Sequence, residues 1–293
     1  MGVGRTVGTR RMQRVTAVAL LRRVVHQWRT AGERVAFVPT MGAIHAGHLS
    51  LVQRARRSSD RVVASIFVNP LQFGPGEDFD KYPRPAARDR ARFADAGVDL
   101  LWEPAVRDVY PVGDRTRVRV EGLTAVLEGA TRPTHFEGVT TVVMRLLHAA
   151  QPDELWLGQK DAQQAIILER MCADLLVPVR VRRGPTMREP DGLALSSRNA
   201  YLAPRERDQA VALSQGLASA RELLVHGERS AGRLVRAIRA EWAGYPLVRE
   251  DYIAVVDSAT LEPVRSVKGR VLVAVAARVG QARLIDNFEW GKA

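Results

Sequence analysis

The stretch Arg34-Val-Ala-Phe-Val-Pro-Thr-Met-Gly-Ala-Ile-His-Ala-Gly-His48 runs from a short apolar segment through a glycine-containing turn into a helical pattern from Leu49. The apolar segment over 34–39 predicts a buried strand. Gly42 permits a tight turn, and Gly47 allows a ligand to approach the backbone. A strand, a turn and a helix in this order predict an anion-binding unit, because the helix N-terminus offers unpaired N–H groups and the positive end of its dipole.

The same alternation of apolar runs and helical patterns continues along the chain. Further strands are expected at 62–68, 98–102, 154–157 and 179–183, and helices at 15–30, 86–96, 138–150 and 161–174. Strands that alternate with helices predict a Rossmann-like, doubly wound α/β fold, in which a parallel sheet is covered on both faces. Ligands of such sheets bind beyond the carboxyl ends of the strands.

The pattern changes after residue 186. Helical stripes at 210–224 and 235–242 precede apolar runs at 252–256, 271–275 and 282–285, which predicts a smaller α+β domain. We therefore expect a disordered tail over 1–14, a Rossmann-like domain over 15–186 and a smaller C-terminal domain over 187–293. The tail is rich in Gly and Arg, and no apolar segment typical of a secretory signal follows it.

The composition is that of an ordinary globular protein. Of the 293 residues, 46% are hydrophobic and 26% are charged. No apolar run approaches the roughly 18 residues of a transmembrane helix, so no membrane partner is expected. Cys172 is the single cysteine, so no internal disulfide can form and a cytoplasmic location is expected. We expect Cys172 to be a small buried side chain rather than a nucleophile.

The formal net charge is +12, and only four of the 44 basic residues are lysine. Such a charge raises the hypothesis of a nucleic-acid-binding protein. No RNP-type, zinc-finger or basic-region pattern accompanies it, so no specific nucleic-acid partner is expected. In an arginine-rich background, a lysine inside a motif, as at Lys160, points to a specific use.

Two histidines follow the first turn. His45 and His48 are three residues apart, so both can face one way at the helix terminus. Imidazole donors at this position can bind polyphosphate and stabilise the charge on a departing pyrophosphate. The structural alternative is a helix cap beside a solvent-facing histidine pair. A zinc site is disfavoured, because His-x-x-His lacks further ligands at a suitable spacing.

Two later segments also offer groups for phosphate. In Gly158-Gln-Lys-Asp161, Lys160 can act as a point charge on phosphate, and Asp161 can cap the helix or accept from a ribose hydroxyl. Gln164, one turn later, can hydrogen-bond a polar substrate. Leu195-Ser-Ser-Arg198 places two hydroxyls and a guanidinium in a loop suited to phosphate. Well-capped helix starts are the structural alternatives for both segments.

Other polar residues lie near the ends of predicted elements. After the second strand, Gln72 is placed to contact substrate and Asn69 to support structure. The Pro- and Gly-containing stretch 70–85, which includes Tyr82, predicts a lid-like loop. Arg132 and His135 precede the 138–150 helix and can approach an anion, or they can simply form a turn.

Together these motifs resemble the pantothenate synthetase (pantoate–β-alanine ligase) family of HIGH-type nucleotidyltransferases. The matching segments are, in order, PTMGAIHAGHLSLV, SIFVNPLQFG, YPR, RPTHFEGVTTVV, GQKDAQQ and DGLALSSRNAYL, followed by LIDN at 284–287. Each motif alone is modest, but six in register are highly specific.

The resemblance implies roles for individual residues in nucleotide chemistry. His48 matches the family's proton donor and His45 its phosphate-binding companion, and both are expected to act mainly as charge stabilisers. Met187 matches a nucleoside contact made by backbone. The ATP-binding residues implied are Met41, Gly42, Ala43, Ile44, His45, Ala46, Gly47, His48, Gly158, Gln159, Lys160, Asp161, Met187, Leu195, Ser196, Ser197 and Arg198, and the catalytic ones are His45, His48, Lys160, Ser196, Ser197 and Arg198.

The resemblance also implies the reaction and its substrates, with a nucleotide- and pantoate-binding domain over 15–186 and a lid domain over 187–293. Gln72 and Gln164 match the pantoate-contacting glutamines, and Asn69, Tyr82 and Arg132 are further candidates for binding pantoate or β-alanine. ATP and pantoate would give pantoyl adenylate and pyrophosphate, and β-alanine would then displace AMP to give pantothenate. Mg²⁺ is expected to neutralise the phosphates through unknown ligands, and a homodimer is implied. A related nucleotidyltransferase that keeps the nucleotide on its product stays open as an alternative.

Three positions depart from the family pattern. Ala46 replaces the acid of the common HEGH, Gln159 replaces that of GEKD, and Arg88 stands where an acidic residue is common. Neither Ala46 nor Gln159 removes a group assigned to chemistry. Arg88 puts in doubt a metal contact at its position.

Overall fold

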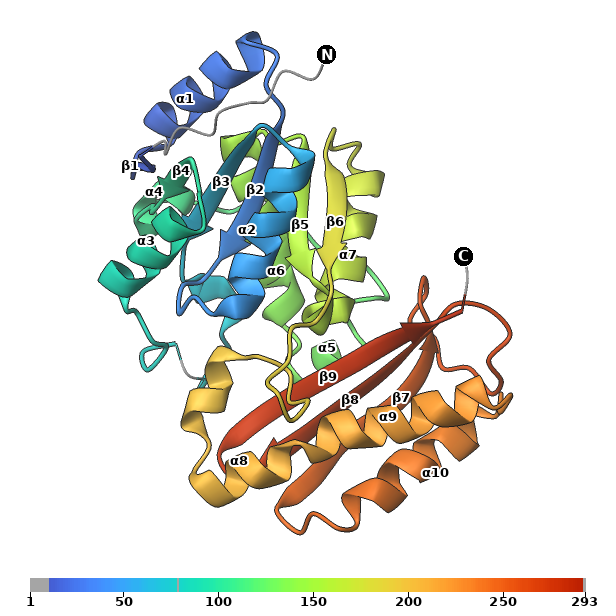
Figure 1. The fold of residues 1–293 in the computed structure, drawn as a ribbon. Helices are drawn as coiled ribbons and strands as arrows, with labels where there is room; N and C mark the ends of the chain where they lie inside the picture. The colour runs from blue at the N-terminus through green and yellow to red at the C-terminus, as the bar shows by residue number, and fades with distance from the viewer. Residues whose placement is uncertain (1–10, 78, 292–293) are drawn as a thin grey trace, which may run out of the picture. The chain divides into compact units, whose positions relative to one another are not determined.

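The computed structural model describes residues 11–77 and 79–291 (Figure 1). The chain divides into two compact units. The first holds the chain up to residue 119 together with 134–157 and 171–184, and the second holds 120–133, 158–170 and 185 onward. The last change of unit, at 184–185, lies beside the boundary expected at 186. Segments 120–133 and 158–170 also belong to the second unit. The sequence pattern does not change at their ends, so it does not mark them as parts of that unit.

A six-stranded sheet with the order β1-β4-β3-β2-β5-β6 forms the centre of the first unit. The neighbouring pairs from β1 to β5 are parallel, and β6 points the same way as β5 (Figure 1). This confirms the predicted α/β class. The strands are β1 (Gln13–Val15), β2 (Val35–Thr40), β3 (Arg61–Ile66), β4 (Leu100–Trp102), β5 (Glu154–Gly158) and β6 (Arg180–Gly184).

Helices cover the sheet because its strands are apolar on both faces. Ala36 and Val38 of β2 join a buried cluster with Leu51 of α2 and Phe93 of α3, since alternate strand residues share a face. The helices are α1 (Val18–Thr30), α2 (Ala46–Ser58), α3 (Ala86–Asp95), α4 (Val106–Val109) and α6 (His135–Ala150), with the 3-10 turn η1 (Pro70–Gln72). Helix α7 (Ala162–Asp174) begins in the second unit and ends in the first.

The N-terminal edge of the sheet differs from expectation. Residues 13 and 14, which the sequence places in a tail, belong to β1, and β1 pairs in register with Leu100–Trp102. The indole Nε1 of the buried Trp102 donates to the Thr16 carbonyl at 2.9 Å. A three-residue strand with the sequence Gln-Arg-Val carries no apolar run, so no pattern could indicate it. Residues 1–10 of the predicted tail lie outside the described residues.

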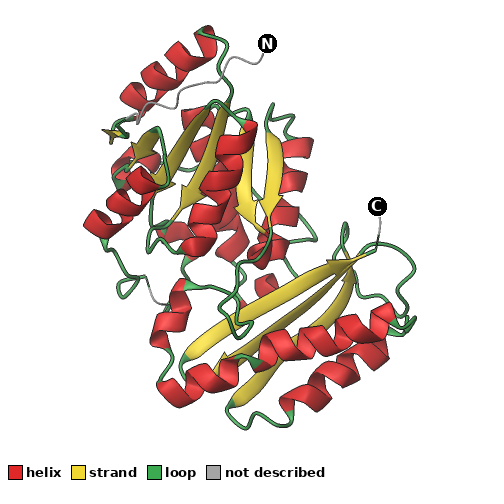
Figure 2. Ribbon diagram, viewed as in Figure 1, coloured by secondary structure: helices red, strands yellow, loops and turns green. Residues whose placement is uncertain are grey.

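The second unit contains an antiparallel sheet with the order β7-β8-β9. Helices α9 (Ala212–Val225) and α10 (Ala231–Trp242) pack on it and share its apolar core (Figure 2). The strands are β7 (Val248–Asp257), β8 (Val271–Val279) and β9 (Ala282–Trp290), and the remaining elements are α5 (Glu128–Thr131), η2 (Gln159–Asp161), η3 (Ser197–Tyr201) and α8 (Pro204–Ala210). The predicted α+β character is confirmed.

Two further findings bear on the expectations from composition. Among the described residues, every helix is too short or too polar to cross a membrane. Cys172 is a buried thiol outside any disulfide, at 4% exposure, which confirms its expected place in the core.

Candidate active site

The turn between β2 and α2 holds both predicted imidazoles. Gly42 has φ +89° and Ala43 has φ +50°, so the chain takes two consecutive left-handed steps before the helix begins. His45 is the N-cap, and its Nδ1 accepts from the Gly47 N–H at 3.2 Å. The Nδ1 of His48 accepts from the His45 N–H at 3.4 Å. The two rings lie 4.1 Å apart between centroids, which confirms that both histidines face one way.

This arrangement sets the chemistry of the imidazoles. A neutral imidazole whose Nδ1 accepts a hydrogen bond carries its proton on Nε2. Each ring therefore holds an Nε2–H donor in a fixed orientation at the N-terminus of a helix, where the dipole also favours an anion. The capping expected as the structural alternative is present as well, and the same contacts that cap the helix orient the donors.

Asn69 is buried at 1% exposure, and four protein groups fill its hydrogen-bonding positions. Its Oδ1 accepts from the Leu71 N–H at 3.3 Å and the Tyr110 hydroxyl at 2.7 Å. Its Nδ2 donates to the Gly138 carbonyl at 3.0 Å and to Gln72 Oε1 at 3.1 Å. Asn69 thus supports Gln72, as its position after the strand suggests. A direct contact of Asn69 with substrate stays a prediction.

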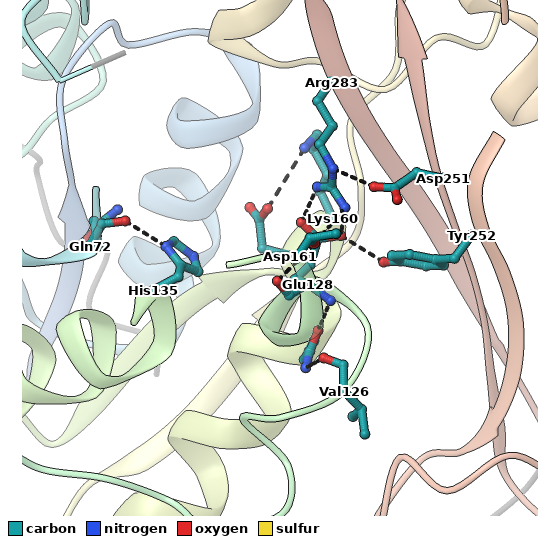
Figure 3. Close-up of polar contacts among 11 residues, drawn as sticks. Gln72, Val126, Glu128, His135, Lys160, Asp161, Asp251, Tyr252 and Arg283 are labelled. Carbon is teal, nitrogen blue, oxygen red and sulfur yellow. Dashed lines mark hydrogen bonds and ion pairs between the residues drawn. The ribbon is translucent and has the colours of Figure 1, made fainter. Parts of the chain in front are cut away.

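Gln72 is also held from two other directions. Its Nε2 lies 3.0 Å from the sulfur of Met41, in the turn between β2 and α2, and its backbone carbonyl lies 2.9 Å from Nδ1 of His135 (Figure 3). Helix α6 packs closely against the η1 turn that contains Gln72. At Gly138 of this helix, an added Cβ would lie only 2.3 Å from the Leu71 carbonyl oxygen. The motif that contains Gly138 therefore helps to place Gln72.

The 70–85 loop has its own small aromatic cluster. Phe73 packs edge-on against Phe79 at 5.3 Å and against Tyr82 at 6.0 Å. Arg84 donates to the carbonyls of Phe79 and Tyr82. Tyr82 is 6% exposed, and its role toward substrate stays a prediction.

Within the second unit, strand β9 anchors the segment that carries Lys160. The Nδ2 of Asn287 donates to the carbonyls of Gln159 at 3.1 Å and Lys160 at 2.7 Å. The Lys160 ammonium lies 3.8 Å from the Asp161 carboxylate. The LIDN motif thus contributes a side chain that fixes the backbone of the predicted phosphate lysine.

The neighbouring residue of β9 anchors a second segment that the sequence predicts to bind nucleotide. Asp286, which is 2% exposed, accepts two hydrogen bonds from Arg188, at 2.6 and 3.0 Å. Arg188 directly follows Met187, whose carbonyl accepts from the Leu195 N–H at 2.9 Å. The acid and the amide of LIDN therefore both bind other parts of the protein.

The serine loop and the 120–133 segment have clear structural roles. Ser196 caps η3 and accepts from the Arg198 N–H at 3.2 Å, so the predicted Ser-rich cap is confirmed for this residue. Arg132 follows α5, whose Glu128 is held by Arg283 and by the Tyr252 hydroxyl at 2.9 Å (Figure 3). Burial and the charge of Glu128 raise the Tyr252 pKa well above its usual value.

The predicted site residues thus fall into two groups. The first unit holds Met41 to His48, Asn69, Gln72 and Tyr82, and the second holds Arg132, Gly158 to Asp161, Gln164, Met187 and Leu195 to Arg198. Contacts join Met41 to Gln72 in the first group, and Asn287 holds Gln159 and Lys160 in the second. Asp89, Gly138 and Asp286 were not singled out from the sequence, because each acts on backbone or on another side chain.

No cluster of three or more His, Cys, Asp or Glu side chains that could hold a metal ion occurs in the described part of the chain. The Mg²⁺ expected with ATP stays a prediction.

The comparisons with known proteins identify the family. The family model for pantoate–β-alanine ligase matches residues 13–289. The pantothenate synthetase of Moorella thermoacetica is 50% identical over 276 residues, covering 94% of this chain and 98% of the relative. The crystal structure of pantothenate synthetase from Thermus thermophilus superposes with a TM-score of 0.91 at 49% identity, covering 96% of this chain and all of that one.

A more distant structure adds information on ligands. Pantoate–β-alanine ligase from Francisella tularensis, complexed with β-γ ATP and β-alanine, is similar with a TM-score of 0.75 and 32% identity, covering 94% of this chain and 97% of that one. The family model spans nearly the whole described chain, and the relatives are matched over almost their full length. The chain therefore belongs to the pantoate–β-alanine ligase family of enzymes.

Proposed function

We propose that the chain condenses pantoate with β-alanine through a pantoyl-adenylate intermediate and releases pyrophosphate and AMP. The observation that carries this proposal is the pair of fixed imidazoles, His45 and His48, at the N-terminus of α2. Their oriented donors suit a polyphosphate. The ATP-type ligand and β-alanine in the related Francisella tularensis enzyme support the same two ligands here.

In the first step, a carboxylate oxygen of pantoate would attack the α-phosphorus of ATP. The bond from that phosphorus to the bridging oxygen breaks, and pyrophosphate leaves with the electron pair. Negative charge grows on the leaving group, so the Nε2–H donors of His45 and His48 and the ammonium of Lys160 would stabilise it. Mg²⁺ would enter as part of the ATP substrate and neutralise its phosphates.

In the second step, the amine of β-alanine would add to the acyl carbon of the adenylate. The carbon–oxygen bond to phosphate breaks, AMP leaves, and the new amide loses a proton to solvent. Gln72 and Gln164 would orient the pantoyl group, and Asn69 would act through Gln72. Ser196, Ser197 and Arg198 would bind the phosphates, since hydroxyls and a guanidinium match their oxygens.

Isotope transfer tests this route. Pantoate labelled with ¹⁸O in its carboxylate should deliver one label to AMP, and pantoate alone should support ATP–pyrophosphate exchange without β-alanine. A product that keeps the nucleotide would indicate a different nucleotidyltransferase. AMP free of label would exclude the adenylate.

The cellular setting is also part of the proposal. We infer a cytoplasmic enzyme from the single buried cysteine and a homodimer from the family resemblance. Sedimentation equilibrium should give twice the chain mass of 32.4 kDa. A monomer at micromolar concentration would contradict the dimer and leave the reaction unaffected.

A further inference from the structure

The nucleotide turn has an unfavourable backbone that something must hold in place. Ala43 follows Gly42 in the left-handed region, with φ +50° after φ +89°. Glycine adopts such angles freely, but alanine does not, because its Cβ crowds the backbone. A non-glycine residue in this region persists only where its surroundings determine it.

Helix α3 supplies those surroundings. Asp89, in its first turn, is 1% exposed. Its Oδ2 accepts from the Ala43 N–H at 2.8 Å, and its Oδ1 accepts from the Ile44 N–H at 2.9 Å. Arg92, one turn later, donates to the Ile44 carbonyl. The N–H groups of Ala43 and Ile44 and the carbonyl of Ile44 are therefore all bound by side chains of α3.

The space under Gly42 is filled by the same carboxylate. A Cβ at Gly42 would lie 3.1 Å from Asp89 Oδ2. A buried carboxylate close to an anion-binding turn is unfavourable for both electrostatics and solvation unless its oxygens are bound. Here both carboxylate oxygens accept from N–H groups of the turn, so the carboxylate stabilises this backbone conformation.

We propose that Asp89 is a positioning residue for the nucleotide-binding step: it fixes Gly42 to Ile44 and thereby sets the direction in which His45 starts α2. His45 caps the helix and binds the His48 ring through its own N–H. A shift of the turn would misdirect both imidazoles together. The expected loss of activity rests on the proposed function. The role of Asp89 in holding the turn rests only on its hydrogen bonds to the backbone.

The test uses Asp89→Asn, which keeps the size and shape of the side chain. One of its two oxygens becomes an NH₂ group, which would face the N–H of Ala43 or Ile44 and cannot accept from it. Asp95→Asn, exposed on the same helix, is the matched control. We expect kcat of pantoate-dependent ATP–pyrophosphate exchange to fall about tenfold or more, with KM for pantoate within about twofold and the control unchanged. Amide hydrogen exchange at Ala43 and Ile44 should become faster in Asp89→Asn alone.

A second-site variant separates positioning from general destabilisation. Ala43→Gly removes the steric cost of the left-handed step, so Asp89→Asn combined with Ala43→Gly should recover part of the lost kcat. If Asp89→Asn does not fold, Arg92→Ala should show the same pattern at smaller amplitude. Unchanged kinetics with unchanged exchange at Ala43 and Ile44 would overturn the proposal, as would losses that merely follow the folded fraction.

The two proposals fail in different ways. Wild-type enzyme without pantoate-dependent exchange would contradict the proposed function, whereas the amide exchange at Ala43 and Ile44 would still report whether Asp89 holds the turn.

Discussion

The two segments predicted to hold ATP phosphates are anchored by opposite chemistry. The turn Gly42–Ile44 of the first unit is bound by a carboxylate, Asp89, that accepts from two amides. The Gln159–Lys160 segment of the second unit is bound by a carboxamide, Asn287, that donates to two carbonyls. Both segments lie between a strand and a helix, but the first presents two N–H groups to its anchor and the second presents two carbonyls. The polarity of the local backbone, not the charge of the ligand, selects the anchor.

The two segments also differ in how much they need an anchor. The first contains a left-handed alanine, whereas Gly158 at the start of the second has an ordinary extended conformation with φ −83°. We therefore expect side chains that touch ATP to matter most, anchors of strained or crowded backbone to matter next, and anchors of relaxed backbone to matter less.

The largest effect is expected for the two side chains proposed to contact ATP phosphates, Lys160 and His48. Lys160→Ala and His48→Ala should each lower kcat by about 100-fold or more, because each would remove a donor that we propose stabilises charge in the transition state. The circular dichroism spectrum and melting temperature should stay close to wild type. Pyrophosphate exchange assays check this, and unchanged exchange in either variant would remove that residue from the site.

A crowded backbone contact comes next. Gly138→Ala should lower kcat by about 100-fold at most, since displacement of a positioned group by about 1 Å can cost that much. Its new Cβ would lie 2.6 Å from the Gln72 nitrogen. Gly232→Ala, where the nearest atom would lie at 3.6 Å, is the control. If both variants behaved alike in the coupled AMP assay, the close approach of α6 would have no catalytic role.

The loss of Asn287, which anchors backbone that is not strained, should give a smaller effect. Asn287→Ala removes the long hydrogen bond that Oδ1 accepts from Gln159 Nε2 at 3.4 Å and the two bonds that Nδ2 donates to carbonyls. The loss of those two donated bonds, at about 1 kcal/mol each, corresponds to about a thirtyfold loss of kcat. Asn287→Asp should be equally impaired, because an ionised carboxylate cannot donate to the two carbonyls. The exposed Gln281→Ala on the same hairpin should leave kcat unchanged. Full activity of Asn287→Asp would show that donation is not what this site requires.

The smallest effect on activity is expected at a charge far from both segments. Glu154 begins β5 at the end of the strand opposite Gly158 and is 1% exposed. Burial opposes its ionisation, but hydrogen bonds from Ser58, Trp156 and Arg182 outweigh burial and lower its pKa. A lowered folded pKa means that the stabilisation is present above the unfolded value and is lost as pH falls through the folded value.

Glu154→Gln should therefore lower the free energy of unfolding by about 1–3 kcal/mol at pH 7. The difference from wild type should shrink as the pH falls below the ordinary glutamate range, and kcat at pH 7 should not change. Urea unfolding at several pH values measures this. A difference that is constant with pH would mean that the charge of Glu154 does not contribute.

The sequence was more informative about candidate side chains than about the contacts that hold their backbone in place. His45, His48 and Lys160 could be picked out as candidates because a histidine pair and a rare lysine are residue types that often carry chemistry. Asp89 and Asp286 look like ordinary acids, and only the fold brings them to a distant turn or arginine. Elements with strong periodicity, such as 86–96 and 138–150, were located within three residues, whereas the three-residue strand β1 left no signal.

The buried state of Cys172 has a practical consequence. The chain has no other thiol, and this one is shielded by the core. A cysteine placed at an exposed position of the 70–85 loop, such as Asp80, would then be the one thiol that a water-soluble maleimide reaches readily. A fluorophore or spin label could be attached there without first removing a native cysteine, and it would report whether the loop moves during turnover as predicted.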